Sequence, residues 1–251
     1  MIIDGHAHVG RWKESTFSAR ETHLSDADAD FAASGVGGAL VMPTDEADNA
    51  GLLAAISSRS GNEPINYRFC AWVDPRDEQN QPWIEANASR IAALKIHPSF
   101  LRMRPTDSAL KSTYELAAKH SWPVLVHCGR WQEMSSWKFG VEVAQNHPQT
   151  NIIMCHMGGD STDLIEATVD ALCGSGPTNA YLGTESIRQY WIVRHAVDRL
   201  GASRIIFGSD YNLNYPAAFV AVVDALGLNS DDRSAVLGSN LNGLLPESNR
   251  F

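Results

Sequence analysis

The sequence has few cysteines, and none of them is spaced as a metal-binding or redox pair. Cys70, Cys128, Cys155 and Cys173 stand singly in a chain of 251 residues, without a CxxC motif. Disulfide frameworks are typical of small secreted domains, whereas a chain of this length can bury a sufficient core without them. We therefore expect each cysteine to be a small buried apolar side chain.

The chain also lacks the segments and the charge that would direct it to a membrane or to nucleic acid. It has no run of about 18 uncharged apolar residues, the length that a membrane-crossing helix needs. It does not open with a basic segment followed by an apolar one, so we predict a cytosolic protein. Basic residues number 20 against 29 acidic ones, and the net charge is −9. Nucleic acid and anionic membranes attract basic surfaces, so both are disfavoured as partners.

What the sequence does contain is a series of short apolar runs rich in β-branched residues. They recur at intervals of roughly 25 to 35 residues, the length of a strand, a helix and their loops. Most are apolar throughout, as in ALVM, VLV, NIIM and RIIF, which is typical of parallel strands buried on both faces. The pattern predicts eight strands, at 1–6, 38–43, 69–74, 93–98, 123–127, 151–156, 180–184 and 204–210.

Segments with helical spacing of apolar residues separate these strands. We predict helices at 25–34, 51–59, 83–90, 115–120, 139–146, 164–172, 190–200, 217–226 and 230–245. Eight strand-helix units without a break in composition favour a single (β/α)8 barrel domain over residues 1–251. The rival architecture, an open doubly wound sheet, usually carries GxGxxG after its first strand, and that motif is absent.

Polar residues gather where the predicted strands end. The first strand ends DGHAH, the fourth KIHP, the fifth VLVHCG, the sixth MCHMGG and the eighth FGSDYN. In a barrel the active site lies at the carboxyl ends of the strands. Neutral imidazoles and a carboxylate are the ligands that zinc and related divalent ions prefer. The sequence therefore predicts a metal site drawn from His6, His8, His97, His127, His156 and Asp210.

The order of these motifs resembles the amidohydrolase superfamily. It is most similar to the amidohydrolase-related branch, which contains hydrolases as well as decarboxylases like aminocarboxymuconate-semialdehyde decarboxylase. The matching segments run along the whole chain: DGHAH at 4–8, LKIHP at 94–98, PVLVHCG at 123–129, CHMGG at 155–159, FGSDY at 207–211 and LGSNLNGLL at 237–245. The resemblance implies a barrel enzyme that acts on a small molecule, in a branch whose members are often homodimers.

Taken residue by residue, the resemblance implies one divalent metal ion, with zinc as the first choice. His6, His8, His127 and Asp210 would bind it. His156 would stand beside the metal-bound water as a base or an electrophile, and Asp210 would pass a proton to the leaving group. A bound cation lowers the pKa of its water toward neutrality, which agrees with this assignment. The expected catalytic residues are therefore Asp210 and His156.

Lys95 is the position at which the number of metal ions stays open. Binuclear members of the superfamily bridge two metals with a carboxylated lysine at the end of the fourth strand, and Lys95 stands two residues before His97. We expect Lys95 to lie too deep to bridge two ions, which favours a mononuclear site. The alternative structural role is a buried lysine paired with an acid.

The loop after the fifth strand, HCGRWQEMSSWKFG, offers candidates for binding the substrate. Arg130 follows His127 by three residues, and its guanidinium would hold a carboxylate as a bidentate pair. Trp131 would add an apolar wall, and His97 stands at the end of the neighbouring predicted strand. We predict these three as substrate-binding residues.

The sequence favours a metal-dependent hydrolase that cleaves an amide, lactone or ester bond of a small polar molecule. The first alternative is a nonoxidative decarboxylase that uses the same metal to bind a carboxylate. Some decarboxylases of the branch carry glutamate as the first residue of HxH, and His6 leans slightly toward hydrolysis. A barrel that keeps its ligands without turnover and a nuclease similar to the TatD family are further alternatives, the second disfavoured by the acidic charge.

Overall fold

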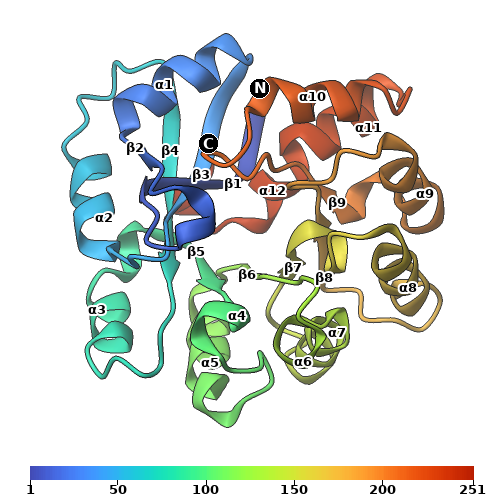
Figure 1. Ribbon diagram of the computed structural model, residues 1–251, viewed down its shortest axis with the longest axis horizontal. Helices are drawn as coiled ribbons and strands as arrows, with labels where there is room; N and C mark the ends of the chain where they lie inside the picture. The colour runs from blue at the N-terminus through green and yellow to red at the C-terminus, as the bar shows by residue number, and fades with distance from the viewer.

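The computed structural model describes all 251 residues as an α/β fold around a curled, largely parallel sheet (Figure 1). The sheet has nine strands in the order β2-β1-β3-β4-β5-β6-β7-β8-β9. All neighbours are parallel except β2, which pairs antiparallel with β1. The bounds are β1 (Ile2–Arg11), β2 (Glu21–Thr22), β3 (Val36–Pro43), β4 (Asn66–Trp72), β5 (Ile91–Ile96), β6 (Val124–Val126), β7 (Ile152–Met154), β8 (Ala180–Gly183) and β9 (Ile205–Ile206).

The structure confirms eight parallel strands in the predicted order, whereas several of their bounds differ. The predicted strands at 151–156 and 204–210 are shorter in the structure, because the chain leaves the ladder before its polar end. His156 and Asp210 have left-handed backbones, with φ of 54° and 63°, which interrupts a strand. The short β2 was not predicted, since two residues give no alternating pattern.

Helices surround the strands in Figure 1. They are α1 (Leu24–Ala33), α2 (Asn49–Ser57), α3 (Asn80–Ala86), α4 (Pro98–Leu101), α5 (Lys111–His120), α6 (Gln132–Ser135), α7 (Trp137–Asn146), α8 (Thr162–Leu172), α9 (Tyr190–Leu200), α10 (Pro216–Asp224), α11 (Ser230–Ser234) and α12 (Asn240–Leu244). The predicted helix at 230–245 is interrupted by a π-turn at Ala235–Ser239. The four-residue helices α4 and α6 were not predicted. None of the helices combines the length and the apolar character that crossing a membrane demands.

The strands carry apolar side chains on both faces, as their composition predicts. One set, with Val41, Leu94 and Ile152, packs in the large core that includes the helices. The alternate set, with Leu125 and Ile153, belongs to a second cluster that also holds Cys70 and Cys155. Three of the four cysteines are buried and Cys173 is partly so, and all four are free thiols.

Residues 207–211 run beside β1 and bring the first and last parallel strands together. The N–H of Gly5 donates to the carbonyl of Phe207 at 2.9 Å, and the N–H of Asp210 donates to the carbonyl of His6 at 3.0 Å. Gly5 is required at this approach, because a Cβ there would lie 2.8 Å from the Phe207 carbonyl oxygen. Histidines near the start of the chain thereby meet an aspartate near its end.

Helix α9 allows a matched test of this packing with two neighbouring residues. Ile192 is fully buried, whereas 48% of Trp191 is exposed. Ile192→Ala is expected to lower the free energy of unfolding by about 2–5 kcal/mol, because it opens a cavity in the core. Trp191→Ala should change it by about 0.5 kcal/mol or less. Urea unfolding followed by circular dichroism measures both, and equal losses would contradict the assigned faces of the helix.

Candidate metal centre

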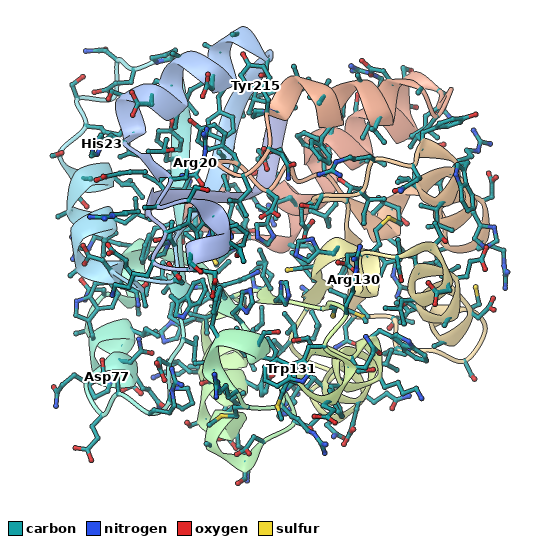
Figure 2. All side chains as sticks on the ribbon, in the orientation of Figure 1. Arg20, His23, Asp77, Arg130, Trp131 and Tyr215 are labelled. Carbon is teal, nitrogen blue, oxygen red and sulfur yellow. The ribbon has the colours of Figure 1, made fainter.

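A cavity of about 650 Å³ gathers the polar residues that the sequence places at the strand ends. Figure 2 shows its rim residues Arg20 and Arg130 on separate segments of the viewed face. The cavity is lined by all six predicted strand-end residues, His6, His8, His97, His127, His156 and Asp210, and by Lys95. These polar residues therefore form one site, although they come from strands and strand ends that are far apart in sequence.

The hydrogen bonds of His6 and His8 fix which ring nitrogens carry protons. Nδ1 of His6 lies 3.0 Å from Oε1 of Glu185, and Nδ1 of His8 lies 2.8 Å from the carbonyl oxygen of Pro43. A carboxylate and a carbonyl can only accept, so each Nδ1 donates and each Nε2 is unprotonated and carries a lone pair. Nε2 of His6 accepts a hydrogen bond from the Lys95 Nζ at 3.4 Å.

The two unprotonated Nε2 atoms lie 3.1 Å apart, with no hydrogen between them. Oδ1 of Asp210 lies 3.6 Å from Nε2 of His6 and 3.8 Å from Nε2 of His8. Two lone pairs repel at this distance, but nitrogens that share one tetrahedral zinc ion stand roughly 3.3 Å apart for bonds of about 2.05 Å. The donor set of His6, His8 and Asp210 therefore fits a divalent cation, and the three atoms are mutually close enough to hold one.

The protonation states of these three side chains suit metal ligands. Burial lowers the pKa of His8 to about 3 and also lowers the pKa of His6, so both rings are neutral at pH 7. Burial opposes ionisation of Asp210, but the neighbouring His6, His156 and His8 and the hydrogen bond from Ser186 hold its pKa below the ordinary value. The site is thus two neutral imidazoles beside a carboxylate, which can hold a metal without first losing protons.

His127 and His156 form a second pair beside this group. Nδ1 of His156 donates to the backbone carbonyl of Glu185 at 3.0 Å, which leaves its Nε2 free to contact Nδ1 of His127 at 3.1 Å. The ring of His127 stacks on that of His97, with centroids 3.8 Å apart, and His97 stacks in turn on Trp72. His127 therefore contacts His156 and His97, and it lies outside the group of His6, His8 and Asp210 whose ligand atoms are mutually close.

Glu185 is a site residue that the sequence analysis missed. It follows β8, lies 1% exposed, and accepts hydrogen bonds at Oε1 from Nδ1 of His6 and, at 3.1 Å, from the backbone N–H of His156. Burial opposes its ionisation, yet His6 and His156 hold its pKa well below the ordinary value. The available signal was a glutamate directly after the predicted strand at 180–184. Of the last three predicted strands, this is the one that does not end in histidine or aspartate.

Lys95 is part of the cavity lining, and whether it lies too deep to bridge two ions stays a prediction. Its side chain is fully buried, and Nζ lies 3.4 Å from Nε2 of His6 and 3.3 Å from Sγ of Cys155. No carboxylate pairs with it, so the predicted structural alternative of a lysine-acid pair is wrong. The number of metal ions bound per chain therefore tests whether Lys95 acts as a bridge.

The predicted substrate-binding residues occupy different positions around the cavity. His97 lies in its lining, and its Nδ1 accepts the N–H of Phe100. Arg130 lies at the rim, 77% exposed, with Nε 3.1 Å from Oδ1 of Asp160. Trp131 is 42% exposed and is not part of the lining. Arg188, which sequence reasoning did not single out, lines the cavity without an ion-pair partner.

Fold and site together define an α/β protein with a buried cluster of histidine and aspartate at the strand ends. The chain belongs to the amidohydrolase family, whose sequence model matches residues 3–240. The family resemblance stated from the sequence motifs is thereby confirmed. No curated protein matches the chain in sequence.

Solved structures similar to this chain include both hydrolases and decarboxylases. An amidohydrolase from Burkholderia multivorans with bound zinc is 14% identical, with a TM-score of 0.76, covering 97% of this chain and 98% of that chain. The 5-carboxyvanillate decarboxylase of Sphingomonas paucimobilis is 14% identical, with a TM-score of 0.71 and the same coverage. A provisionally assigned 2-pyrone-4,6-dicarboxylic acid hydrolase of Pseudomonas putida is 19% identical, with a TM-score of 0.73, covering 97% and 96%. At these identities the likeness concerns the fold.

Asp4 holds the backbone on both sides of this site through hydrogen bonds. Its Oδ1 accepts the N–H groups of His6 and Ser209, both at 3.0 Å, and so ties β1 to the segment that carries Asp210. Its Oδ2 is buried without a hydrogen-bond partner. Burial raises the pKa of Asp4 from 3.8 to about 7.

Asp4→Asn should therefore change how stability depends on pH. Between pH 3.8 and about 7 the unfolded carboxyl is ionised while the folded one keeps its proton, so the wild type loses stability as pH rises. The asparagine variant has no such loss. Its free energy of unfolding relative to wild type should rise by up to about 1.4 kcal/mol per pH unit across this window. Urea unfolding of metal-free protein at pH 4.5 and 7 measures the difference; a constant difference would contradict the raised pKa.

Proposed function

We propose that this member of the amidohydrolase family is a metal-dependent hydrolase with one divalent ion, zinc first among candidates. The observation that carries the proposal is the facing pair of unprotonated Nε2 atoms on His6 and His8, with Oδ1 of Asp210 beside them. His127 is proposed as the fourth ligand. The hydrogen bonds between residues 207–211 and β1 support a complete (β/α)8 barrel with this centre at its mouth.

The chain's own residues suit proton transfer at this centre. When bound, a divalent cation supplies a Lewis acid and lowers the pKa of water at the site. His156 presents a lone pair on Nε2, because its Nδ1 is committed to the Glu185 carbonyl, and can accept a proton there. Asp210 keeps its carboxylate oriented through the Ser186 hydroxyl, which donates to Oδ2 at 2.7 Å. We assign the catalytic roles to Asp210 and His156.

The cavity favours a small planar or apolar substrate with a carboxylate. Trp12, Phe17 and Phe100 line it beside the metal centre, and Arg20 and Arg188 line it as cations. Trp12 and Phe17 pack edge to face, with centroids 4.7 Å apart, and form an apolar wall. An arginine can hold a carboxylate with two charge-assisted hydrogen bonds.

A nonoxidative decarboxylase is the second candidate function, and the same two features support it. A cavity with an aromatic wall and unpaired arginines accepts an aromatic acid as readily as a lactone. The similar structures include proteins named for both activities. The two functions differ in their products, so identifying the product decides between them.

Product analysis tests the proposal directly. Metal-free protein is reloaded with Zn²⁺ or Mn²⁺ and incubated with 2-pyrone-4,6-dicarboxylate, 5-carboxyvanillate, 2,6-dihydroxybenzoate and simple lactones in H2(18)O. Incorporation of the heavy oxygen into the organic product supports hydrolysis. Release of carbon dioxide with no heavy oxygen in the organic product makes the decarboxylase reading correct.

The metal content of the protein tests the number of ions. One equivalent of metal supports the mononuclear site, and two would make Lys95 a candidate bridge.

Asp210→Asn is expected to remove most turnover and to leave the fold intact. The substitution removes a carboxylate that both binds the metal and carries a proton, and loss of such a group lowers kcat by roughly 100- to 10,000-fold. Asp198→Asn, which removes an exposed carboxylate paired with Arg194 on α9, is the matched control and should keep full activity. Circular dichroism checks the fold. An active Asp210→Asn enzyme would refute the role of this residue.

Arg188→Ala should raise KM more than Arg130→Ala does. Arg188 has no ion-pair partner in the cavity, whereas the charge of Arg130 is already paired with Asp160. A hydrogen bond to a charged group contributes about 1.5–3 kcal/mol, which corresponds to a rise of roughly 10- to 150-fold in KM. Steady-state kinetics with a carboxylate substrate measures both variants. A larger effect at Arg130 would restore that residue, with its neighbour Trp131, as the main substrate contact.

A further inference from the structure

Glu185 is the one carboxylate that contacts both parts of the proposed centre. Its Oε1 accepts a hydrogen bond from Nδ1 of the proposed ligand His6 at 3.0 Å and another from the backbone N–H of His156 at 3.1 Å. Its own backbone carbonyl accepts from Nδ1 of His156 at 3.0 Å. His6 and His156 lie 150 positions apart in the sequence, and this single residue bonds to both.

The space around this carboxylate is shaped for it. Glu185 is almost fully buried, so it is not an exposed acid that happens to touch a ring. Gly183 lies two residues earlier, and a Cβ there would come within 2.3 Å of Oε2 of Glu185. A glycine at the end of β8 therefore leaves the room that the carboxylate occupies.

The next residue continues the same arrangement. Ser186 donates through Oγ to Oδ2 of Asp210 and accepts a hydrogen bond from Nδ2 of Asn214 at 3.0 Å. The dipeptide Glu185-Ser186 thus contacts His6, His156 and Asp210, which come from three different strand ends. A hydrogen bond to one of them alone would be ordinary packing. Contact with all three means that this segment holds the three side chains in position relative to one another.

We propose that Glu185 is a positioning residue that fixes the His6 tautomer for metal binding and, through the same oxygen, places His156 beside it. This inference rests on the proposed metal-dependent function. A carboxylate on Nδ1 keeps the proton there, leaves Nε2 unprotonated beside His8 and Asp210, and makes the imidazole a stronger ligand. Loss of the carboxylate therefore weakens the metal site and releases His156 together.

Two variants of similar shape separate the charge of Glu185 from its hydrogen bonds. Glu185→Gln keeps an acceptor oxygen but loses the negative charge, and Glu185→Met loses both. The control is Asp28→Asn, which neutralises a largely buried carboxylate paired with Arg59 outside the cavity. Binding of Zn²⁺ and of Mn²⁺ to each metal-free protein is measured by calorimetry, with circular dichroism to confirm folding.

We expect Glu185→Gln to weaken metal binding by about 10-fold and Glu185→Met by about 100-fold, since loss of an outer partner costs roughly 10- to 100-fold in affinity. Asp28→Asn should bind as wild type does. Long-range ¹H–¹⁵N spectra should show the Nδ1–H tautomer of His6 in wild type and in Glu185→Gln but not in Glu185→Met. In the methionine variant the amide hydrogen of His156 should also exchange faster.

The outcomes distinguish this inference from the proposed function. Wild-type protein that binds metal while both variants bind it equally well, with an unchanged His6 tautomer, would show that Glu185 only fills space and would overturn the inference alone. Wild-type protein that binds neither Zn²⁺ nor Mn²⁺ would overturn the proposed function, and the inference with it.

Discussion

The candidate metal centre depends on the backbone contact between β1 and residues 207–211. His6 and His8 project from the first strand, and Asp210 follows the last, so no local interaction can bring them together. The hydrogen bonds of Gly5 with Phe207 and of Asp210 with His6 hold the two segments in register. Asp4 supports the same junction by accepting N–H groups from both sides of it. A shift of one residue would turn alternate side chains of β1 away from the cavity.

The second constraint is electrostatic, because this polar cluster lies against an apolar interior. Buried imidazoles favour the neutral form, and three of them, His6, His8 and His156, commit Nδ1 to an oxygen that accepts the hydrogen bond. The lone pairs are thereby turned inward, toward the cavity and toward one another. The repulsion between facing lone pairs destabilises the metal-free protein, whereas a bound cation would turn the same lone pairs into favourable contacts. This is the arrangement expected of a cation-binding site.

Much of the fold was predictable from the sequence, and so was the gathering of the strand-end histidines and Asp210 in one cavity. The eight parallel strands follow from apolar runs such as ALVM and NIIM, because strands buried on both faces admit few polar residues. The sequence placed His6, His8, His127, His156 and Asp210 at strand ends, and the structure brings them into the lining of one cavity, because the carboxyl ends of parallel strands meet at one edge of a sheet. The short helices α4 and α6 were missed, because four residues carry no periodic signal.

The sequence by itself therefore determined the α/β class, the order of the strands and the residue types at their ends, since these depend on local composition and spacing. Only the tertiary structure decided which atoms face one another. It brought Glu185 into hydrogen-bond contact with both His6 and His156, placed Lys95 beside His6, paired Arg130 with Asp160 and left Arg188 without an ion-pair partner. Each of these facts joins side chains from different strand ends or loops, and distances of this kind are set by the curvature and register of the sheet, which no short stretch of sequence encodes.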